Sequence, residues 1–197
     1  FSTGAAAAGH VVHYACDADA DALETHRRNH PDAQHVCASL PQLDAPLPFP
    51  ADAAATPFHV HGSPPCQKYS KGNTRNRDEE GRALSDNLVE WYLETALASG
   101  ATSWSMEEVD TPAVVRIVQR VQQRYPGCVA YAKFDFTTLG VPQTRTRLIA
   151  GTPSLVAGLQ RRAQEEPRRS VRDVIARPRG THIKSTTTWV KRRKRDV

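Results

Sequence analysis

Three short polar clusters contain the residue types that covalent catalysis uses. They are PPCQ around Cys66, MEEV around Glu107, and GVPQTRTR with Arg145 and Arg147, each about 40 residues from the next. A thiolate is a nucleophile, a glutamate can hold or transfer a proton, and arginines supply permanent positive charge. A lone cysteine in a turn is ordinarily a small buried hydrophobe, so the surrounding sequence has to decide whether this one is reactive.

The cysteine of the first cluster follows two prolines, Pro64 and Pro65. Each proline has a fixed φ and no backbone N–H, which excludes a helix interior or a central strand. The preceding FHVH stretch, residues 58–61, predicts a short strand. Cys66 is therefore expected on a stiff turn just past the carboxyl end of a strand, the edge at which open α/β sheets bind ligands.

The elements that must position these clusters alternate between strand and helix. Apolar and β-branched runs predict strands, whereas apolar residues at helical spacing, with proline or glycine at the ends, predict helices. The predicted strands are 11–17, 58–61, 102–109 and 128–135, and the predicted helices are 18–31, 84–99 and 111–125, after an alanine-rich helix end that stops at Gly9. This alternation predicts an α/β fold with a mostly parallel sheet and helices on both faces.

Two stretches lack apolar periodicity. Residues 67–83 are polar and contain glycine, which predicts a loop of lid length, and residues 165–197 are expected to be irregular. From Arg161 onward, 13 lysines and arginines face 4 acidic residues, a balance of +9 within a total of +5. Such a tail is typical of contact with nucleic acid, of nuclear import, or of a solvated charge run.

Composition excludes several classes of protein. The four cysteines are scattered without zinc-site spacing, which predicts a reduced intracellular protein and no metal. No apolar run approaches the roughly 20 residues of a bilayer span, and no signal peptide stands at the start, so we expect no membrane contact. The expected location is the nucleus in a eukaryote or in the host of a eukaryotic virus, and the cytoplasm otherwise.

The three clusters in this order resemble the motifs of the DNA cytosine-5 methyltransferase family, over roughly residues 1–152. The resemblance implies a Rossmann-like, S-adenosylmethionine-dependent methyltransferase fold. It implies methyl transfer to carbon 5 of a cytosine flipped out of double-stranded DNA. Cys66 would add to carbon 6, Glu107 would hold N3 and the exocyclic amine, and Arg145 and Arg147 would lie near the base and its phosphates.

The resemblance also implies sites for the methyl donor and the substrate. An acidic residue after the second family strand holds the ribose, which fits Asp17 and, next best, Asp19. The cofactor-binding set is Asp17, Asp19, Ser39 and Pro64, and the substrate-binding set is Gln67, Ser70, Arg82 and Gln143. Two positions depart from the family pattern: Ser39 replaces an aspartate, and Glu108 replaces an asparagine beside Glu107.

The matched motifs also imply how the chain is organised. Phe1 matches the phenylalanine after the family's glycine-rich turn, so the first strand and that turn are expected to be missing from residues 1–160, a partial catalytic domain. Residues 161–197 would be a basic extension toward an absent target-recognition region. A second polypeptide could supply the missing motifs. Two alternatives stay open: a tRNA cytosine-5 methyltransferase of the same family, and a non-catalytic fragment that binds nucleic acid.

Overall fold

The structure is a computed structural model that describes residues 1–40, 56–65 and 79–174, with the backbone alone for residues 79–87. The chain begins with helix α1 (Ser2–Ala7), strand β1 (Tyr14–Asp17), helix α2 (Ala20–Asn29) and strand β2 (Gln34–Cys37). Gly9 ends the first helical stretch with φ at 87°, the left-handed region that glycine enters without strain. The expected helix end at Gly9 is confirmed.

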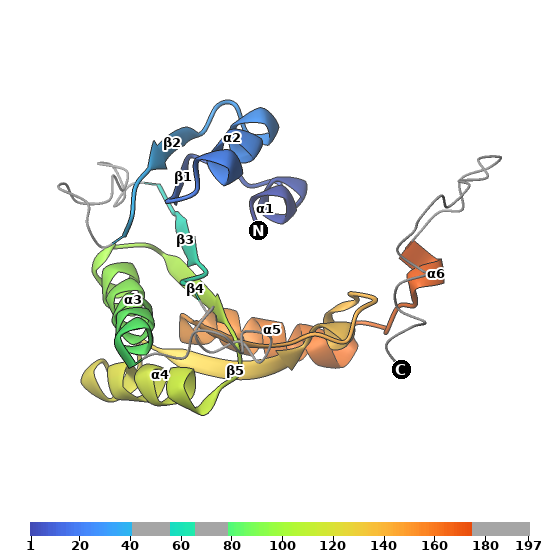
Figure 1. Cartoon of the computed structure of the whole chain (residues 1–197). Helices are drawn as coiled ribbons and strands as arrows, with labels where there is room; N and C mark the ends of the chain where they lie inside the picture. The colour runs from blue at the N-terminus through green and yellow to red at the C-terminus, as the bar shows by residue number, and fades with distance from the viewer. Residues whose placement is uncertain (41–55, 66–78, 175–197) are drawn as a thin grey trace, which may run out of the picture.

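Strands β1 and β2 form a parallel pair, with Tyr14 opposite Gln34 and Asp17 opposite Cys37. Helix α2 connects them and packs on the pair through the buried side chain of Leu23. Figure 1 shows this unit at the top of the molecule, in blue. It is a strand–helix–strand unit of the kind that α/β folds repeat.

A second sheet contains four strands in the order β3 (His59–Gly62), β4 (Ser103–Glu108), β6 (Thr146–Gly151) and β5 (Ala130–Asp135). Strand β3 is parallel to β4, but β6 is antiparallel to both β4 and β5. The α/β class and the parallel β1–β2 and β3–β4 pairs agree with the expectation. The expectation of a mostly parallel sheet holds only in part, because β6 returns from β5 in the reverse direction.

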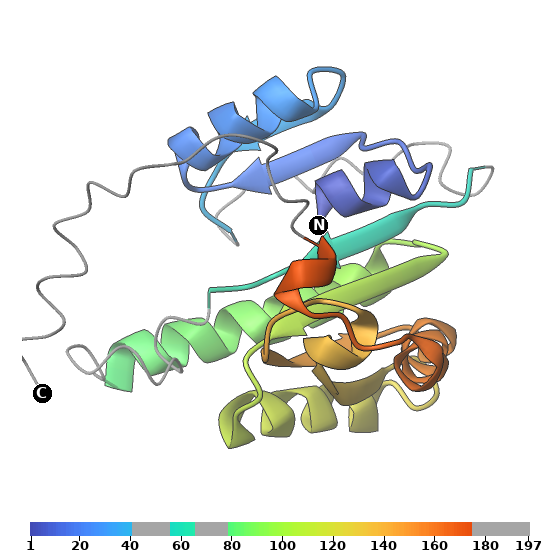
Figure 2. The ribbon, with the colours of Figure 1, turned by 90° about the vertical axis from the view of Figure 1, so that its right-hand side faces the viewer.

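Helices cover both faces of the four-stranded sheet (Figures 1 and 2). Helices α3 (Glu79–Ala98) and α4 (Pro112–Arg124) pack against each other and against one face, where Leu93, Met106 and Leu148 are buried in a common apolar core. Helix α5 (Pro153–Glu165) packs against β5, β6 and the 3-10 helix η1 (Phe136–Leu139). Because side chains alternate along a strand, successive side chains of β4 point by turns to the layer of α3 and α4 and to the opposite face of the sheet.

Helix α4 shows why these segments become helices. Thr111 caps it by accepting a hydrogen bond from the Val114 N–H, and Pro112 stands in its first turn, where a missing N–H has no cost. Its buried residues Val114, Ile117, Val118 and Val121 follow helical spacing along one face. Because that pattern is local, the helix could be predicted from the sequence.

Two irregular stretches contain more helix than the sequence suggested. Helix α3 begins at Glu79, so the expected loop of residues 67–83 is wrong over its last five positions. Helix α6 (Val171–Val174) lies within the stretch that was expected to be irregular. Local propensity does not show the full length of α3, because this helix gains stability from the α4 and β4 surfaces on which it packs. No helix in the described ranges is long and apolar enough to cross a membrane.

Helix α1 connects the two sheets. The Phe1 ring stacks on the imidazole of His61 at 3.8 Å between ring centroids, and the Ser2 hydroxyl lies 2.9 Å from Nε2 of His26 on α2. Both histidines have a lowered pKa because burial disfavours the charged imidazolium. The contacts between α1, β3 and α2 are therefore made by neutral rings at physiological pH.

Candidate active site

The carboxylate of Glu107 joins three segments at the carboxyl end of β4. Its Oε1 lies 2.7 Å from Nε of Arg147 and 3.5 Å from Nη2 of Arg145. Its Oε2 accepts a hydrogen bond from the Ser63 hydroxyl at 3.2 Å, just after β3 ends. The structure thus brings together three of the four predicted catalytic residues, Glu107, Arg145 and Arg147. A carboxylate held in this way has a fixed orientation and can offer its oxygens to a substrate.

The two arginines reach Glu107 because they stand two residues apart on extended backbone. Strand β6 begins at Thr146, between them, so both side chains extend from the same side of the chain. The Arg147 side chain is 21% exposed, against 42% for Arg145, and its Nη1 also donates to the Thr146 carbonyl at 2.8 Å. Arg147 is therefore the fixed member of the pair.

Gln143 lies exposed in the turn that precedes β6, where its backbone N–H donates to the Val141 carbonyl at 2.8 Å. Pro64 is half-buried in the turn after β3, next to the Ser63 that bonds Glu107. Arg82 lies within helix α3, and the structure describes only its backbone. The predicted Cys66, Gln67 and Ser70 also lie outside the described residues.

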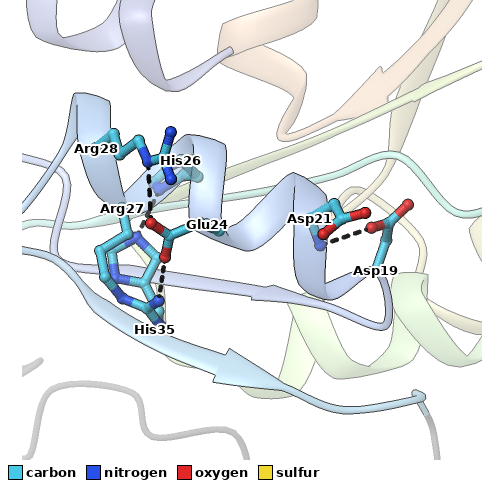
Figure 3. A network of polar contacts seen from close by, with 7 residues as sticks. All are labelled: Asp19, Asp21, Glu24, His26, Arg27, Arg28 and His35. Atoms are coloured by element: carbon cyan, nitrogen blue, oxygen red, sulfur yellow. Dashed lines mark hydrogen bonds and ion pairs between the residues drawn. The ribbon is translucent and has the colours of Figure 1, made fainter.

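The predicted cofactor residues lie at the carboxyl edge of the β1–β2 pair. Asp17 ends β1, and its Oδ1 accepts from the Asp19 N–H at 2.9 Å. Asp19 is the N-cap of α2, because its Oδ1 accepts from the N–H group of Asp21 (Figure 3) and from that of Ala22. Asp19 therefore has a structural role in the helix, whatever else it binds. Ser39 is exposed two residues beyond β2.

Helix α2 carries a polar network, partly exposed and partly packed on β2, that lies apart from the Glu107 cluster. Glu24 pairs with Arg27 at 2.8 Å and with Arg28 at 3.0 Å, and Nδ1 of His26 lies 2.8 Å from Nε2 of His35 (Figure 3). These pairs lie within helical spacing or on the neighbouring strand, where they support the helix. Within the described ranges, no group of three His, Cys, Asp or Glu side chains is placed to hold a metal ion.

Glu108 stands out in the sequence only as a departure from a family pattern, and the structure gives it a distinct environment. Its side chain is fully buried, and burial raises its pKa to about 7, with a smaller contribution from the negative charge of Glu107. Ser63 was not predicted at all. Its position directly before Pro64 and Pro65, in the turn that leads to Cys66, was the available signal.

No protein-family model and no curated protein matches the chain, whereas solved structures do. A structure assigned as a DNA modification methyltransferase encoded within an E. coli prophage matches 81% of this chain with a TM-score of 0.58 and 23% identity. The chain has a methyltransferase fold. It spans 44% of the length of that prophage structure.

Two Dnmt2 structures match this methyltransferase fold more weakly. That of S. pombe covers 72% of the chain and 42% of its own length, with 17% identity and a TM-score of 0.45. That of Spodoptera frugiperda covers 70% and 41%, with 17% identity and a TM-score of 0.42. The methyltransferase fold, which the prophage structure carries, agrees with the resemblance that the three sequence motifs suggested.

Proposed function

We propose that this chain is the catalytic part of a DNA cytosine-5 methyltransferase. The observation that carries the proposal is the Glu107 cluster. A carboxylate bound by Arg147 and by Ser63 lies at the edge from which the chain runs through Pro64 and Pro65 into Cys66. In covalent methylation of a pyrimidine, a thiol adds to the ring while a carboxyl group hydrogen-bonds to the same ring. The methyltransferase fold supports a methyl-transfer role for this pair.

The proposed reaction begins with addition of the Cys66 thiolate to carbon 6 of cytosine, which makes carbon 5 an electron-rich enamine. The Glu107 carboxyl group holds the exocyclic amine and shares a proton with N3, which offsets the charge that builds on the ring and returns to the carboxyl group when the ring is restored. Arg147 keeps the Glu107 carboxylate in one orientation through the 2.7 Å contact. After methyl transfer, loss of the carbon 5 proton and departure of the sulfur restore the aromatic ring.

The proposed methyl donor is S-adenosylmethionine, which supplies an electrophilic methyl group. The carboxyl edge of the β1–β2 pair has groups that fit its nucleoside, because Asp17 presents an exposed carboxylate for the ribose and Ser39 an exposed hydroxyl where the family contacts the adenine edge. Ribose hydroxyls require an acceptor of this kind. Asp19 would support the site by capping α2 and by its N–H bond to Asp17.

The proposed substrate is double-stranded DNA from which the target cytosine is flipped out. Chemistry at carbon 5 and carbon 6 requires access to both faces of the ring, which stacking in a duplex denies. Arg145, which is more exposed than Arg147, has donors free to bind a phosphate beside the flipped base. Gln143 and the basic extension that follows residue 160 would add contacts to the same strand.

The direct test is trapping of the covalent adduct on DNA that contains 5-fluorocytosine. Because fluorine at carbon 5 cannot leave as a proton does, the covalent intermediate of a cytosine-5 methyltransferase accumulates and migrates as a protein–DNA adduct on a denaturing gel. The full-length protein is expected to form this adduct with S-adenosylmethionine present, and Cys66→Ser is expected to abolish it. Cys128→Ser is the matched control, since Cys128 is an exposed free thiol outside the three motifs.

Three results would contradict parts of the proposal. An adduct that persists in Cys66→Ser would remove that residue from the mechanism. An adduct on tRNA but not on DNA would assign the chain to the RNA-methylating alternative. Binding of DNA without any adduct or methyl transfer by the wild-type protein would favour the non-catalytic alternative.

A further inference from the structure

Glu108 is an ionisable residue in a buried, mostly apolar position. Only 1% of its surface is exposed, and its Oε2 accepts a hydrogen bond from the Val109 N–H at 2.7 Å. Its Oε1 is fully buried and has no hydrogen-bond partner among the described residues. An ionised carboxylate with a bare buried oxygen is costly, whereas a protonated carboxyl carries no charge to solvate.

The described surroundings of Glu108 on β4 are mostly apolar. In the antiparallel register Glu108 lies opposite Leu148, which is part of the apolar core beneath α3 and α4. Of the buried core side chains that the described parts of α3 and α4 bring to this face, only Tyr92 is titratable, and its hydroxyl donates to the Ser105 carbonyl. His61 of β3 hydrogen-bonds the Ser105 hydroxyl, and alternation places Ser105 on the opposite face from Glu108.

Two charges among the described residues act on Glu108. The adjacent carboxylate of Glu107 disfavours its ionisation, and the guanidinium of Arg147 favours it. Arg147 is also the group that holds Glu107, at 2.7 Å. The register puts the side chains of Glu107 and Arg147 on one face of the sheet and that of Glu108 on the other, so Arg147 acts on Glu108 through its charge. An ionised Glu108 would therefore place a second negative charge behind the Glu107–Arg147 pair.

We propose that Glu108 is a positioning residue that works as a neutral carboxylic acid, and that an ionised Glu108 would add a second negative charge behind Glu107 and weaken the hold of the Arg147 guanidinium on Glu107. This rests on the proposed function, because it assigns a role in that same site. The family resemblance has an uncharged asparagine at this position, and a protonated glutamate is uncharged as well. The site thus keeps one negative charge near the base, although its sequence contains two carboxylates.

The first experiment measures the protonation of Glu108 without relying on activity. The pKa of Glu108 is raised from its ordinary value of 4.5 to about 7, so the folded state binds the proton more tightly than the unfolded state. Its contribution to stability is fully present below its ordinary pKa and is lost as the pH rises through about 7. Urea unfolding of the full-length protein across this range should show Glu108→Gln gaining stability relative to wild type as the pH rises. Glu107→Gln, which removes an ion-paired carboxylate, should show no such gain.

The second experiment measures methyl transfer on cytosine-containing DNA, or adduct formation on its 5-fluorocytosine analogue. At about one pH unit above its pKa, roughly one tenth of Glu108 is neutral, so the wild-type rate should fall about tenfold relative to Glu108→Gln between about pH 6 and about pH 8. Every other group of the site is the same in the two proteins. The ratio of the two rates therefore isolates Glu108.

The outcomes separate the inference from the proposed function. Parallel pH–stability curves for wild type and Glu108→Gln would overturn the neutral carboxyl. Diverging stability curves with equal pH–rate profiles would overturn the positioning role. Diverging stability curves with no methyl transfer from either protein would support the neutral carboxyl and refute the proposed function. Divergence in both measurements is the expected result.

Discussion

The arginines at the site differ in what they contribute to Glu107. Arg147 reaches Oε1 at 2.7 Å from a mostly covered position, whereas Arg145 lies at 3.5 Å from the same oxygen and is more exposed. Solvent screens the more exposed Arg145–Glu107 pair more strongly, and the exposed Arg145 side chain loses more conformational freedom when it is held in one geometry. The orientation of Glu107 should therefore depend on Arg147, and Arg145 remains available for a phosphate.

A double-mutant cycle checks this difference. Coupling between Glu107→Gln and Arg147→Ala is expected to be about 1.5 to 3 kcal/mol in the free energy of unfolding, as for a partly buried, charge-assisted hydrogen bond. Coupling between Glu107→Gln and Arg145→Ala is expected below about 1 kcal/mol. Equal couplings for the two arginines would contradict the assignment of Arg147 as the fixed member.

At the scale of elements, strand β3 must approach helix α3 closely so that its last residue leads into the Ser63 turn. Gly62, at the end of β3, has no side chain, and a Cβ there would clash with the ring of Tyr92. Tyr92 cannot move aside freely, because it is buried and its hydroxyl donates to the Ser105 carbonyl at 2.8 Å. The close approach of β3 and α3 thus positions Ser63 and the segment that follows it.

Two glycine substitutions should act in opposite directions. Gly62→Ala is expected to destabilise the protein by about 1 to 3 kcal/mol, because the added methyl overpacks a fixed ring. Gly158→Ala, inside helix α5, is expected to stabilise it by up to about 1 kcal/mol, because the nearest atom to a new Cβ is the end of a flexible arginine at 3.9 Å and alanine favours the helix. Urea unfolding measures both, and a stabilised Gly62→Ala protein would disprove the close contact.

For the whole molecule, charge is distributed unevenly along the chain. The +9 balance that begins at Arg161 starts inside helix α5 and continues through residues 175–197, which lie outside the described part. A polyanion would be attracted to this end of the chain over a longer range than any contact at Glu107 extends. Attraction to DNA and orientation of the base are therefore separable properties.

The salt dependence of DNA affinity should separate long-range attraction to DNA from orientation of the base. Replacing Lys191, Arg192, Arg193, Lys194 and Arg195 with glutamine is expected to lower the slope of log affinity for nonspecific DNA against log salt by up to about 4.5, at about 0.9 for each phosphate that the chain no longer neutralises. Arg147→Ala should leave the slope within about 1 of the wild-type value. Filter binding at several salt concentrations measures both proteins. A slope that the five replacements leave unchanged would exclude a DNA contact by this stretch.

Much of the local structure could be predicted from the sequence, because its causes are local. The apolar spacing of residues 112–124 and the Thr111 cap determine helix α4, and Gly9 ends α1. The two-residue spacing of Arg145 and Arg147 places both side chains on one side of an extended segment. The motifs around Cys66, Glu107 and these arginines are sufficient by themselves to suggest a methyltransferase.

Only the tertiary structure decided which of these groups meet. Strand β6 lies antiparallel between β4 and β5, and this non-local pairing, which no residue pattern within β6 specifies, brings Arg147 to Glu107. The burial of Glu108 likewise depends on α3 and α4 packing over the β4 face. The physical reason is that side-chain types and periodicities are properties of short segments. Ion pairing and desolvation are set instead by segments far apart in the chain, once the sheet has formed.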